Sequence, residues 1–293
     1  MTLGFIRPET VYEAMEFLSE HKDNSRIVAG ATDVMVQMRS AKSTGHAEEK
    51  PLWMVDITNI PGLSYVNFEN RIVRIGAMTT HRDIARSAVI RDVVPFLADA
   101  CRSVGSPQIR TRGTIGGNIV NASPAADSLP PLTALSARLR LISRKGPRDV
   151  ALEEFFKGPY RTIIEPDEIL EEVYFEAPES SSGCAFLKLG RRESLAIARL
   201  SVAVLLDVDE SGKISKAAIA PGACLPMPAR ITSAEEALIG EIPNEEAVHS
   251  ASLEVGEEMV RVSGVRWSTE YKKPVVCALT KRAIWKALGV DED

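Results

Sequence analysis

The chain has 293 residues, of which 45% are hydrophobic and 26% are charged, and its formal net charge is −5. This composition predicts a soluble globular protein, and the length predicts two or three lobes rather than one core. The acidic balance argues against a nucleic-acid-binding surface, and no apolar run approaches the roughly 20 residues that span a membrane. The first residues lack the features of a signal peptide, so we expect a cytoplasmic protein.

Residues 1–57 predict a strand–helix–strand lobe. Thr10, followed by Glu13 at capping-box spacing, predicts the start of a helix that ends near His21. A short strand at 26–30 then leads into a loop of small residues. The unbroken apolar run at 52–57 indicates a buried strand, and the polar segment before it, 40–51, indicates a loop.

Residues 58–177 predict a second lobe with a hairpin, short helices and further strands. The predicted strands are 65–68, 72–75, 138–142, 148–152 and 168–175. The predicted helices follow Thr79 or Thr80, cover 93–104, and begin after Asp127 and Ser128 with two prolines in the first turn.

The serine-containing segment 178–183 breaks this pattern and predicts the start of a C-terminal lobe over 178–293. Its expected strands are 185–190, 201–207 and 214–220, and its expected helices are 233–239, 245–262 and 274–288. Strands followed by helices predict an antiparallel sheet covered by helices, which is an α+β arrangement.

The stretch 112–127 is the densest in groups that suit a nucleotide. It contains three glycines, two hydroxyl side chains, two asparagines and one carboxylate. Glycine leaves no β-carbon between a backbone N–H and a ligand, and successive N–H groups in such a loop can bind an anion. A tight turn between two strands is the alternative interpretation. Another loop of small residues, at 27–34, supports the anion-binding interpretation, because two such loops can hold the two ends of one diphosphate.

Other site types find no support in the sequence. The four cysteines, Cys101, Cys184, Cys224 and Cys277, are far apart and form no C-x-x-C pair, so we expect buried free thiols and no metal or iron–sulfur site. Neither loop follows the G-x-G-x-x-G pattern of nicotinamide-binding dehydrogenases, and no P-loop lysine occurs. We identify no nucleophile–base pair, and we therefore predict no catalytic residues.

The two loops together resemble the FAD-binding medium subunits of the molybdenum hydroxylase family, which includes the flavin subunits of xanthine, carbon monoxide and nicotinate dehydrogenases. The resemblance extends to 105–110, 167–170 and 188–195, and Tyr271-Lys272-Lys273 is similar to the usual Tyr-Arg-Arg of the family. It implies an α+β fold: a two-lobed PCMH-type FAD-binding domain, with lobes 1–57 and 58–177, and a C-terminal domain, 178–293, like that of carbon monoxide dehydrogenase flavoproteins.

The resemblance also implies where FAD contacts the chain. The loop 27–34 should wrap the pyrophosphate with backbone N–H donors, and residues 114–118 should lie on its other side. Asp127 should bind hydroxyls of the ribityl or ribose portion, and Lys188 should approach the isoalloxazine ring. Gly105, Arg161 and Leu170 should lie against the cofactor. The implied residues are Ile27, Val28, Ala29, Gly30, Ala31, Thr32, Asp33, Val34, Gly105, Thr114, Ile115, Gly116, Gly117, Asn118, Asp127, Arg161, Leu170 and Lys188.

Several of these residues have simpler alternatives. Asp33 and Asp127 are also candidate helix caps, and Lys188 is also a candidate solvated strand residue. The family usually has Gly-Gly where this chain has Gly30-Ala31. Ala31 therefore either adopts a negative φ or tolerates a strain of about 1 kcal/mol.

The implied function is electron transfer. Electrons would pass from a molybdopterin-binding large subunit through the clusters of an iron–sulfur small subunit to FAD. They would then leave FAD to an acceptor such as NAD+. No nucleic acid and no membrane is expected as a partner. The alternative is a cofactor-free scaffold or small-molecule-binding subunit of such a complex, for which the alanine at position 31 is the only sequence support.

Overall fold

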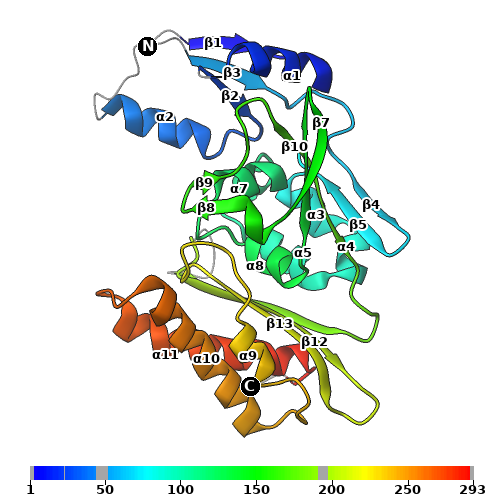
Figure 1. Ribbon diagram of the computed structural model, residues 1–293, viewed down its shortest axis with the longest axis vertical. Helices are drawn as coiled ribbons and strands as arrows, with labels where there is room; N and C mark the ends of the chain where they lie inside the picture. Colours follow the sequence, from blue (N-terminus) through cyan, green and yellow to red (C-terminus); the bar gives the residue numbers. More distant parts are fainter. Residues whose placement is uncertain (1–2, 23, 44–51, 191–196, 291–293) are drawn as a thin grey trace.

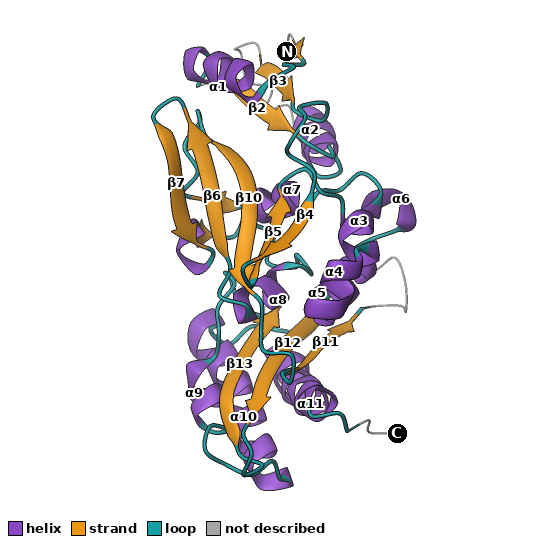
Figure 2. Cartoon of the chain, turned by 90° about the vertical axis from the view of Figure 1, so that its right-hand side faces the viewer, coloured by secondary structure: helices purple, strands orange, loops and turns teal. Residues whose placement is uncertain are grey.

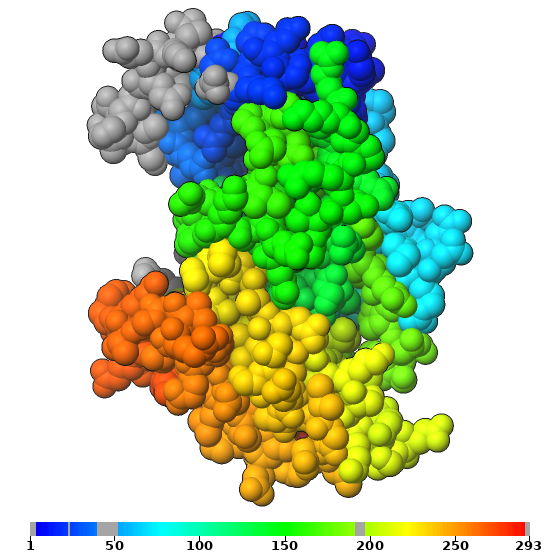
Figure 3. All heavy atoms as spheres, in the orientation of Figure 1, coloured from blue at the N-terminus to red at the C-terminus, as the bar shows by residue number. Residues whose placement is uncertain are grey.

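The computed structural model describes residues 3–22, 24–43, 52–190 and 197–290. The N-terminal, middle and C-terminal parts of the chain follow one another along the long axis of the molecule (Figures 1 and 3). Of the predicted loop 40–51, residues 44–51 lie outside the described residues. The described helices include none that is long and apolar enough to cross a membrane.

The N-terminal part is a three-stranded parallel sheet with the strand order β1-β3-β2. Its elements are β1 (Leu3–Ile6), α1 (Val11–Glu20), β2 (Ser25–Val28), α2 (Val34–Ser43) and β3 (Leu52–Asp56). Thr10 caps α1 as predicted, because its hydroxyl accepts the N–H of Glu13 at 3.1 Å. On the inner face of α1, Ala14 and Leu18 pack in one buried cluster with Val55 of β3. The strand β1 had not been predicted.

The middle part is a five-stranded antiparallel sheet with helices on one face (Figure 2). Its strands are β4 (Val66–Glu69), β5 (Ile72–Gly76), β6 (Arg138–Ser143), β7 (Gly146–Ala151) and β10 (Ile169–Glu176), and a separate pair is formed by β8 (Phe156–Gly158) and β9 (Arg161–Thr162). Its helices are α3 (His81–Arg86), α4 (Ala88–Val93), α5 (Pro95–Ser103), α6 (Pro107–Arg110), α7 (Ile115–Asn121), α8 (Leu129–Ala134) and the 3-10 turn η1 (Glu153–Phe155).

Alternation along the strands explains why only one face of this sheet carries helices. Leu139 and Leu141 of β6 are fully buried and belong to the core beneath the helices. Between them, Arg140 faces the opposite side, where Glu172 of β10 lies 3.5 Å from its guanidinium group. The polar face of the sheet is thereby neutralised by ion pairs, and the apolar face forms the core that supports the segments described below.

The C-terminal part is a three-stranded antiparallel sheet followed by helices. Its elements are β11 (Gly183–Leu189), β12 (Leu200–Val208), β13 (Ile214–Gly222), α9 (Thr232–Glu236), α10 (Glu245–Ser263) and α11 (Thr269–Ala287). Val202 and Val204 of β12 pack against α10 and α11, whereas Ala203 between them belongs to the core of the middle part. Both faces of this sheet are therefore buried, one against its own helices and one against the middle part (Figure 2).

The last helix begins earlier than the sequence indicates. Its expected start was Pro274, but α11 begins at Thr269 and contains Pro274 in its interior. Lys272 therefore lies on this helix rather than in the loop before it.

Candidate functional site: two loops, a buried ion pair and a cavity

The first loop, residues 29–33, connects the end of β2 to the start of α2. Gly30 lies so close to the second loop that a β-carbon at this position would be 1.9 Å from the carbonyl oxygen of Arg112. Only glycine can occupy such a position without a shift of the backbone. The contact brings together two segments that are about 80 positions apart in the sequence. The two loops are therefore close enough to bind one ligand between them.

Ala31 adopts a φ of 62°, so of the two predicted alternatives the structure has the strained one. A left-handed residue in such a turn points successive N–H groups to the same side, which forms an anion-binding concavity. Within the described part of the chain, the N–H groups of residues 30–33 have no hydrogen-bond acceptor. Backbone strain persists where the surroundings require it, and it often marks a functional site.

The second loop is the start of a helix, not a tight turn between two strands. Thr114 is the N-cap of α7, and its hydroxyl accepts the N–H of Gly117 at 3.1 Å. A β-carbon on Gly116 would lie 2.6 Å from that of Ala77, and the Gly116 N–H donates to the Ala77 carbonyl at 2.9 Å. The small residues therefore serve close packing here.

This geometry changes the role expected for residues 114–118. The N–H groups of Ile115, Gly116, Gly117 and Asn118 all donate to acceptors within the chain. The free N–H donors are in the first loop, and the second loop supplies a close backbone wall and the positive end of a short helix.

A supporting segment, residues 77–81, was expected only to lead into the helix after Thr79 or Thr80, and no role at the site was predicted for it. The carbonyl of Thr79 accepts the N–H of Ile115 at 3.0 Å, and the N–H of His81 donates to the carbonyl of Gly113 at 3.0 Å. Burial lowers the pKa of His81 to about 4, with a further lowering by the charge of Arg110, so the imidazole is neutral at pH 7. The two hydrogen bonds from this segment fix the position of the second loop.

Asp127 and Lys188 form a buried ion pair between the middle and the C-terminal parts. The Lys188 ammonium lies 2.5 Å from Oδ2 of Asp127 and also donates to the Ser103 carbonyl at 2.9 Å. The other carboxylate oxygen of Asp127 is buried and has no hydrogen-bond partner. Burial raises the pKa of Asp127 to about 6, against the opposing effects of Lys188 and of the nearby Ser103 hydroxyl, which itself donates to the Ala100 carbonyl at 2.8 Å. Lys188 is thus not a solvated strand residue.

Asp127 does not cap the following helix either. The N-cap of α8 is Ser128, whose hydroxyl donates instead to the side-chain oxygen of Asn118 at 2.7 Å. This bond links α7, which carries the second loop, to the segment that carries Asp127.

The remaining predicted residues are more scattered. Gly105 adopts a φ of 43° between α5 and α6 and packs against Ile109. Leu170 lies in the core of the middle part, and Arg161 is exposed on β9. Asp33 is exposed at the end of the first loop. The resemblance to 188–195 extends over residues 191–196, which lie outside the described residues.

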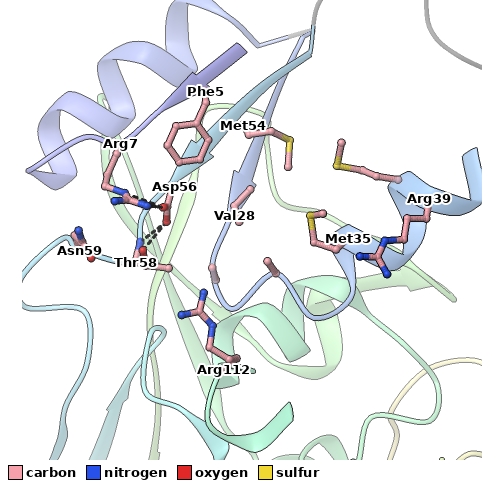
Figure 4. A pocket seen from close by; sticks show the side chains of 13 residues that line it. Phe5, Arg7, Val28, Met35, Arg39, Met54, Asp56, Thr58, Asn59 and Arg112 are labelled. Carbon is pink, nitrogen blue, oxygen red and sulfur yellow. Dashed lines mark hydrogen bonds and ion pairs between the residues drawn. The ribbon is translucent and has the colours of Figure 1, made fainter. Parts of the chain in front are cut away.

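A cavity of about 640 Å³ borders the first loop (Figure 4). The sheet and α2 supply apolar side chains to it, and charged groups line its rim. The lining residues used below are Phe5, Arg7, Met35, Met38, Met54, Asp56 and Arg112. The Arg7 guanidinium pairs with Asp56 at 2.7 Å. Sequence reasoning missed this cavity, because its lining residues come from β1, β3 and α2, which are separate in the sequence.

These features fit a dinucleotide cofactor. Free N–H groups beside a strained alanine suit a diphosphate, an unpartnered carboxylate oxygen suits a ligand hydroxyl, and a cavity with apolar side chains suits an aromatic ring. A residue cluster that could hold a metal ion does not occur among the described residues. The fold and the site together define a dinucleotide-binding protein with an appended α+β domain.

Comparison with known proteins identifies the family. The family model described as FAD binding domain in molybdopterin dehydrogenase matches residues 1–177, and that described as CO dehydrogenase flavoprotein C-terminal domain matches residues 185–287. The chain belongs to this family of FAD-binding medium subunits, as the two loops had indicated, and its cofactor is FAD.

Relatives cover nearly the whole chain. It is 34% identical over 291 residues to the nicotinate dehydrogenase FAD-subunit of Eubacterium barkeri, covering 98% of this chain and 95% of that one. It is 32% identical to the caffeine dehydrogenase subunit beta of Pseudomonas sp. strain CBB1, covering 97% and 94%. A chain of the reconstituted CO dehydrogenase from Oligotropha carboxidovorans superposes with a TM-score of 0.90 at 26% identity, covering 99% and 98%. The α+β fold prediction is confirmed.

Proposed function

We propose that this chain is the electron-transfer subunit of a molybdenum hydroxylase complex, in which electrons pass from the clusters of an iron–sulfur small subunit through FAD to an acceptor such as NAD+. The molybdopterin-binding large subunit would hold the organic substrate. The observation that carries the proposal is the meeting of the two loops beside the Asp127–Lys188 pair. Names of relatives, such as the carbon monoxide dehydrogenase medium chain of Hydrogenophaga pseudoflava, support a multi-subunit setting.

In this proposal the cofactor supplies the redox chemistry and the chain supplies binding and electrostatics. The N–H groups of residues 30–33 hold the pyrophosphate, and the wall formed by Gly113 and Thr114 excludes water from its other side. Asp127 accepts a hydroxyl of the cofactor through its unpartnered oxygen. Lys188 provides a cation at the flavin end, which favours a reduced, anionic ring.

We place the adenosine end in the cavity beside the first loop. Ala31 and Arg112 line that cavity, so it is continuous with the proposed pyrophosphate site. Met35, Met38 and Met54 offer a polarizable apolar surface for a flat base. The opposite end of the cofactor then reaches Asp127 and Lys188. We retain the division into lobes 1–57, 58–177 and 178–293, supported by buried clusters centred on each part.

The alternative, a cofactor-free scaffold, is disfavoured by the cost of leaving polar groups without partners. A buried carboxylate oxygen without a hydrogen bond costs about 1–3 kcal/mol. A chain that had lost its ligand would have no reason to retain that cost.

The test begins with purification of the complex from its native source and identification of the partner chains by mass. Flavin reduction should then be followed in the whole complex after rapid mixing with the organic substrate, and oxidation after mixing with NAD+. Co-purification with an iron–sulfur chain and a molybdopterin chain, with flavin reduced after the clusters, is expected. A yellow single chain without such partners would contradict the proposal, and a colourless complex would favour the scaffold alternative.

A further inference from the structure

Two neighbouring lysines at the start of α11 have different partners. The ammonium of Lys272 donates to the backbone carbonyl of Ala223 at 2.7 Å, and this contact is partly buried. The ammonium of Lys273 instead pairs with the exposed carboxylate of Glu257 at 2.6 Å. A charge-assisted bond to a partly buried carbonyl is stronger than an exposed ion pair. Lys272 therefore has a role that Lys273 lacks.

The carbonyl that Lys272 holds belongs to a strained turn. Ala223 follows β13 directly and adopts a φ of 62°, a conformation that non-glycine residues keep only where their surroundings fix it. The hydroxyl of Ser263, at the end of α10, donates to the next carbonyl, that of Cys224, at 2.8 Å. The last residues of α10 and the first turn of α11 thus hold two consecutive carbonyls of this turn.

The other side of the turn contacts the segment that carries Asp127. The Ala223 N–H donates to the carbonyl of Pro124 at 2.9 Å. A β-carbon on Gly222 would lie 2.7 Å from Pro130, so the chain approaches α8 closely there. Figure 1 shows the yellow segment after β13 next to α8.

The segment from Pro124 to Asp127 is thereby held from the C-terminal part at both ends. Lys188 binds the Asp127 carboxylate, and Ala223 binds the Pro124 carbonyl. A displacement of the turn would move Pro124 and, three residues later, the unpartnered oxygen of Asp127.

We propose that Lys272 is a positioning residue of the FAD site: by fixing the turn 222–224 it holds Pro124, and through Pro124 it fixes the direction of the Asp127 carboxylate. This inference rests on the proposed contact between Asp127 and the cofactor. It gives a role to the lysine in the Tyr271-Lys272-Lys273 sequence, which lies outside the two cofactor loops.

The first measurement is the affinity of the full chain for FAD, by equilibrium titration, in Lys272→Met, Lys272→Arg and the matched control Lys273→Met. Lys272→Met keeps the length of the side chain and removes the donor, so we expect about tenfold weaker binding, as for the loss of one charge-assisted hydrogen bond. Lys272→Arg should keep most of the parent's affinity for FAD, and Lys273→Met should bind FAD as tightly as the parent. The visible circular dichroism of the bound flavin should change only in Lys272→Met.

The second measurement combines Lys272→Met with Asp127→Ala, because coupled residues give non-additive effects. The double variant should bind FAD no more weakly than Asp127→Ala alone. An effect of Lys272→Met that adds to that of Asp127→Ala, or that equals that of Lys273→Met, overturns the inference about Lys272. Unchanged affinity in Asp127→Ala overturns instead the proposed contact of Asp127 with the cofactor. If Lys272→Met does not fold, Ser263→Ala replaces it in the double-variant measurement, because Ser263 on α10 holds the same turn. Its effect on FAD affinity should likewise not add to that of Asp127→Ala, and an additive effect overturns the inference.

Discussion

Gly30 packs so tightly against the carbonyl group of Arg112 that a β-carbon on Gly30 would lie 1.9 Å from the carbonyl oxygen. Gly30→Ala must therefore push the two loops apart, and we expect it to abolish measurable FAD binding and to lower the stability by several kcal/mol. Gly113→Ala is the matched control for stability, because a β-carbon there would lie 3.1 Å from its nearest atom and the neighbouring groups need shift only slightly. Thermal unfolding and FAD titration of both variants test this. Equal effects of the two substitutions would contradict the close contact.

The affinity for FAD should depend more on Asp127 than on Asp33. Asp127 is 6% exposed and has an unpartnered oxygen, whereas Asp33 is exposed. Removing a buried carboxylate that accepts a ligand hydroxyl costs about 1.5–3 kcal/mol, and loss of a helix cap costs about 1. Equilibrium titration of Asp127→Ala and Asp33→Ala should give this order, and parent-like affinity in Asp127→Ala would remove that residue from the site.

Asp127 should also make the stability of the apoprotein depend on pH. Its pKa of about 6 in the folded chain is above the value of about 3.9 in an unfolded chain, so the folded state binds the proton more tightly. Its contribution therefore favours folding below about pH 4 and is lost as the pH rises to about 6, by up to roughly 3 kcal/mol. The free energy of unfolding by urea should be measured between pH 4 and 7 in the parent and in Asp127→Asn. The difference between the two should change over this window; a constant difference would be the contrary result.

Ala31→Gly should relieve local strain. A residue other than glycine at a φ of 62° costs about 1 kcal/mol, partly offset by the greater freedom of glycine in the unfolded chain. We expect an unfolding free energy that is higher by about 0.5 kcal/mol, with FAD affinity equal to or above that of the parent. A clear loss of affinity would indicate that the methyl group of Ala31, which lines the cavity, contacts the cofactor.

The chain alone should bind FAD without a covalent bond and should not oxidise organic substrates. The described residues contain no metal-ligand cluster, and neither loop contains a histidine or cysteine that could attach the flavin. Acid precipitation should release all the yellow colour. With metals chelated, the FAD-loaded chain should oxidise no purine, aldehyde or N-heterocycle, while it can still pass electrons from NADH to a dye. Steady turnover of such a substrate would indicate a self-contained flavoenzyme.

The predictions from sequence succeeded where local chemistry determines the structure. Thr10 and Thr80 cap their helices because the hydroxyl needs only the N–H three residues later. The hairpin around Asn70 and Arg71 forms because the two residues of its turn adopt positive φ values, which lets β4 and β5 pair antiparallel on either side. In contrast, Pro274 gave a wrong helix start, because α11 already begins at Thr269, and its first turn contacts the distant Ala223 carbonyl through Lys272.

The candidate site was predictable only in part, because its groups come from distant segments. The two loops could be located from their small residues, but Ala77 and His81, which support the second loop, have no distinctive local pattern. Likewise, the N–H groups of Ile115 and Gly116 have acceptors only because the carbonyls of Thr79 and Ala77 lie next to them. The pairing of Asp127 with Lys188 joins residues 61 positions apart, which spacing alone cannot predict.

The sheet of the C-terminal part has consequences for how the molecule unfolds. Ala203 on β12 belongs to the middle core, while its neighbours Val202 and Val204 face α10 and α11. Unfolding of the middle part or of helices α10 and α11 would expose aliphatic side chains of β12 to water. Neither part can therefore unfold without weakening the other. We therefore expect the two parts to lose structure together in one cooperative transition, with the slowest amide hydrogen exchange along β12. A proteolytic cut between them would then release no independently stable C-terminal fragment.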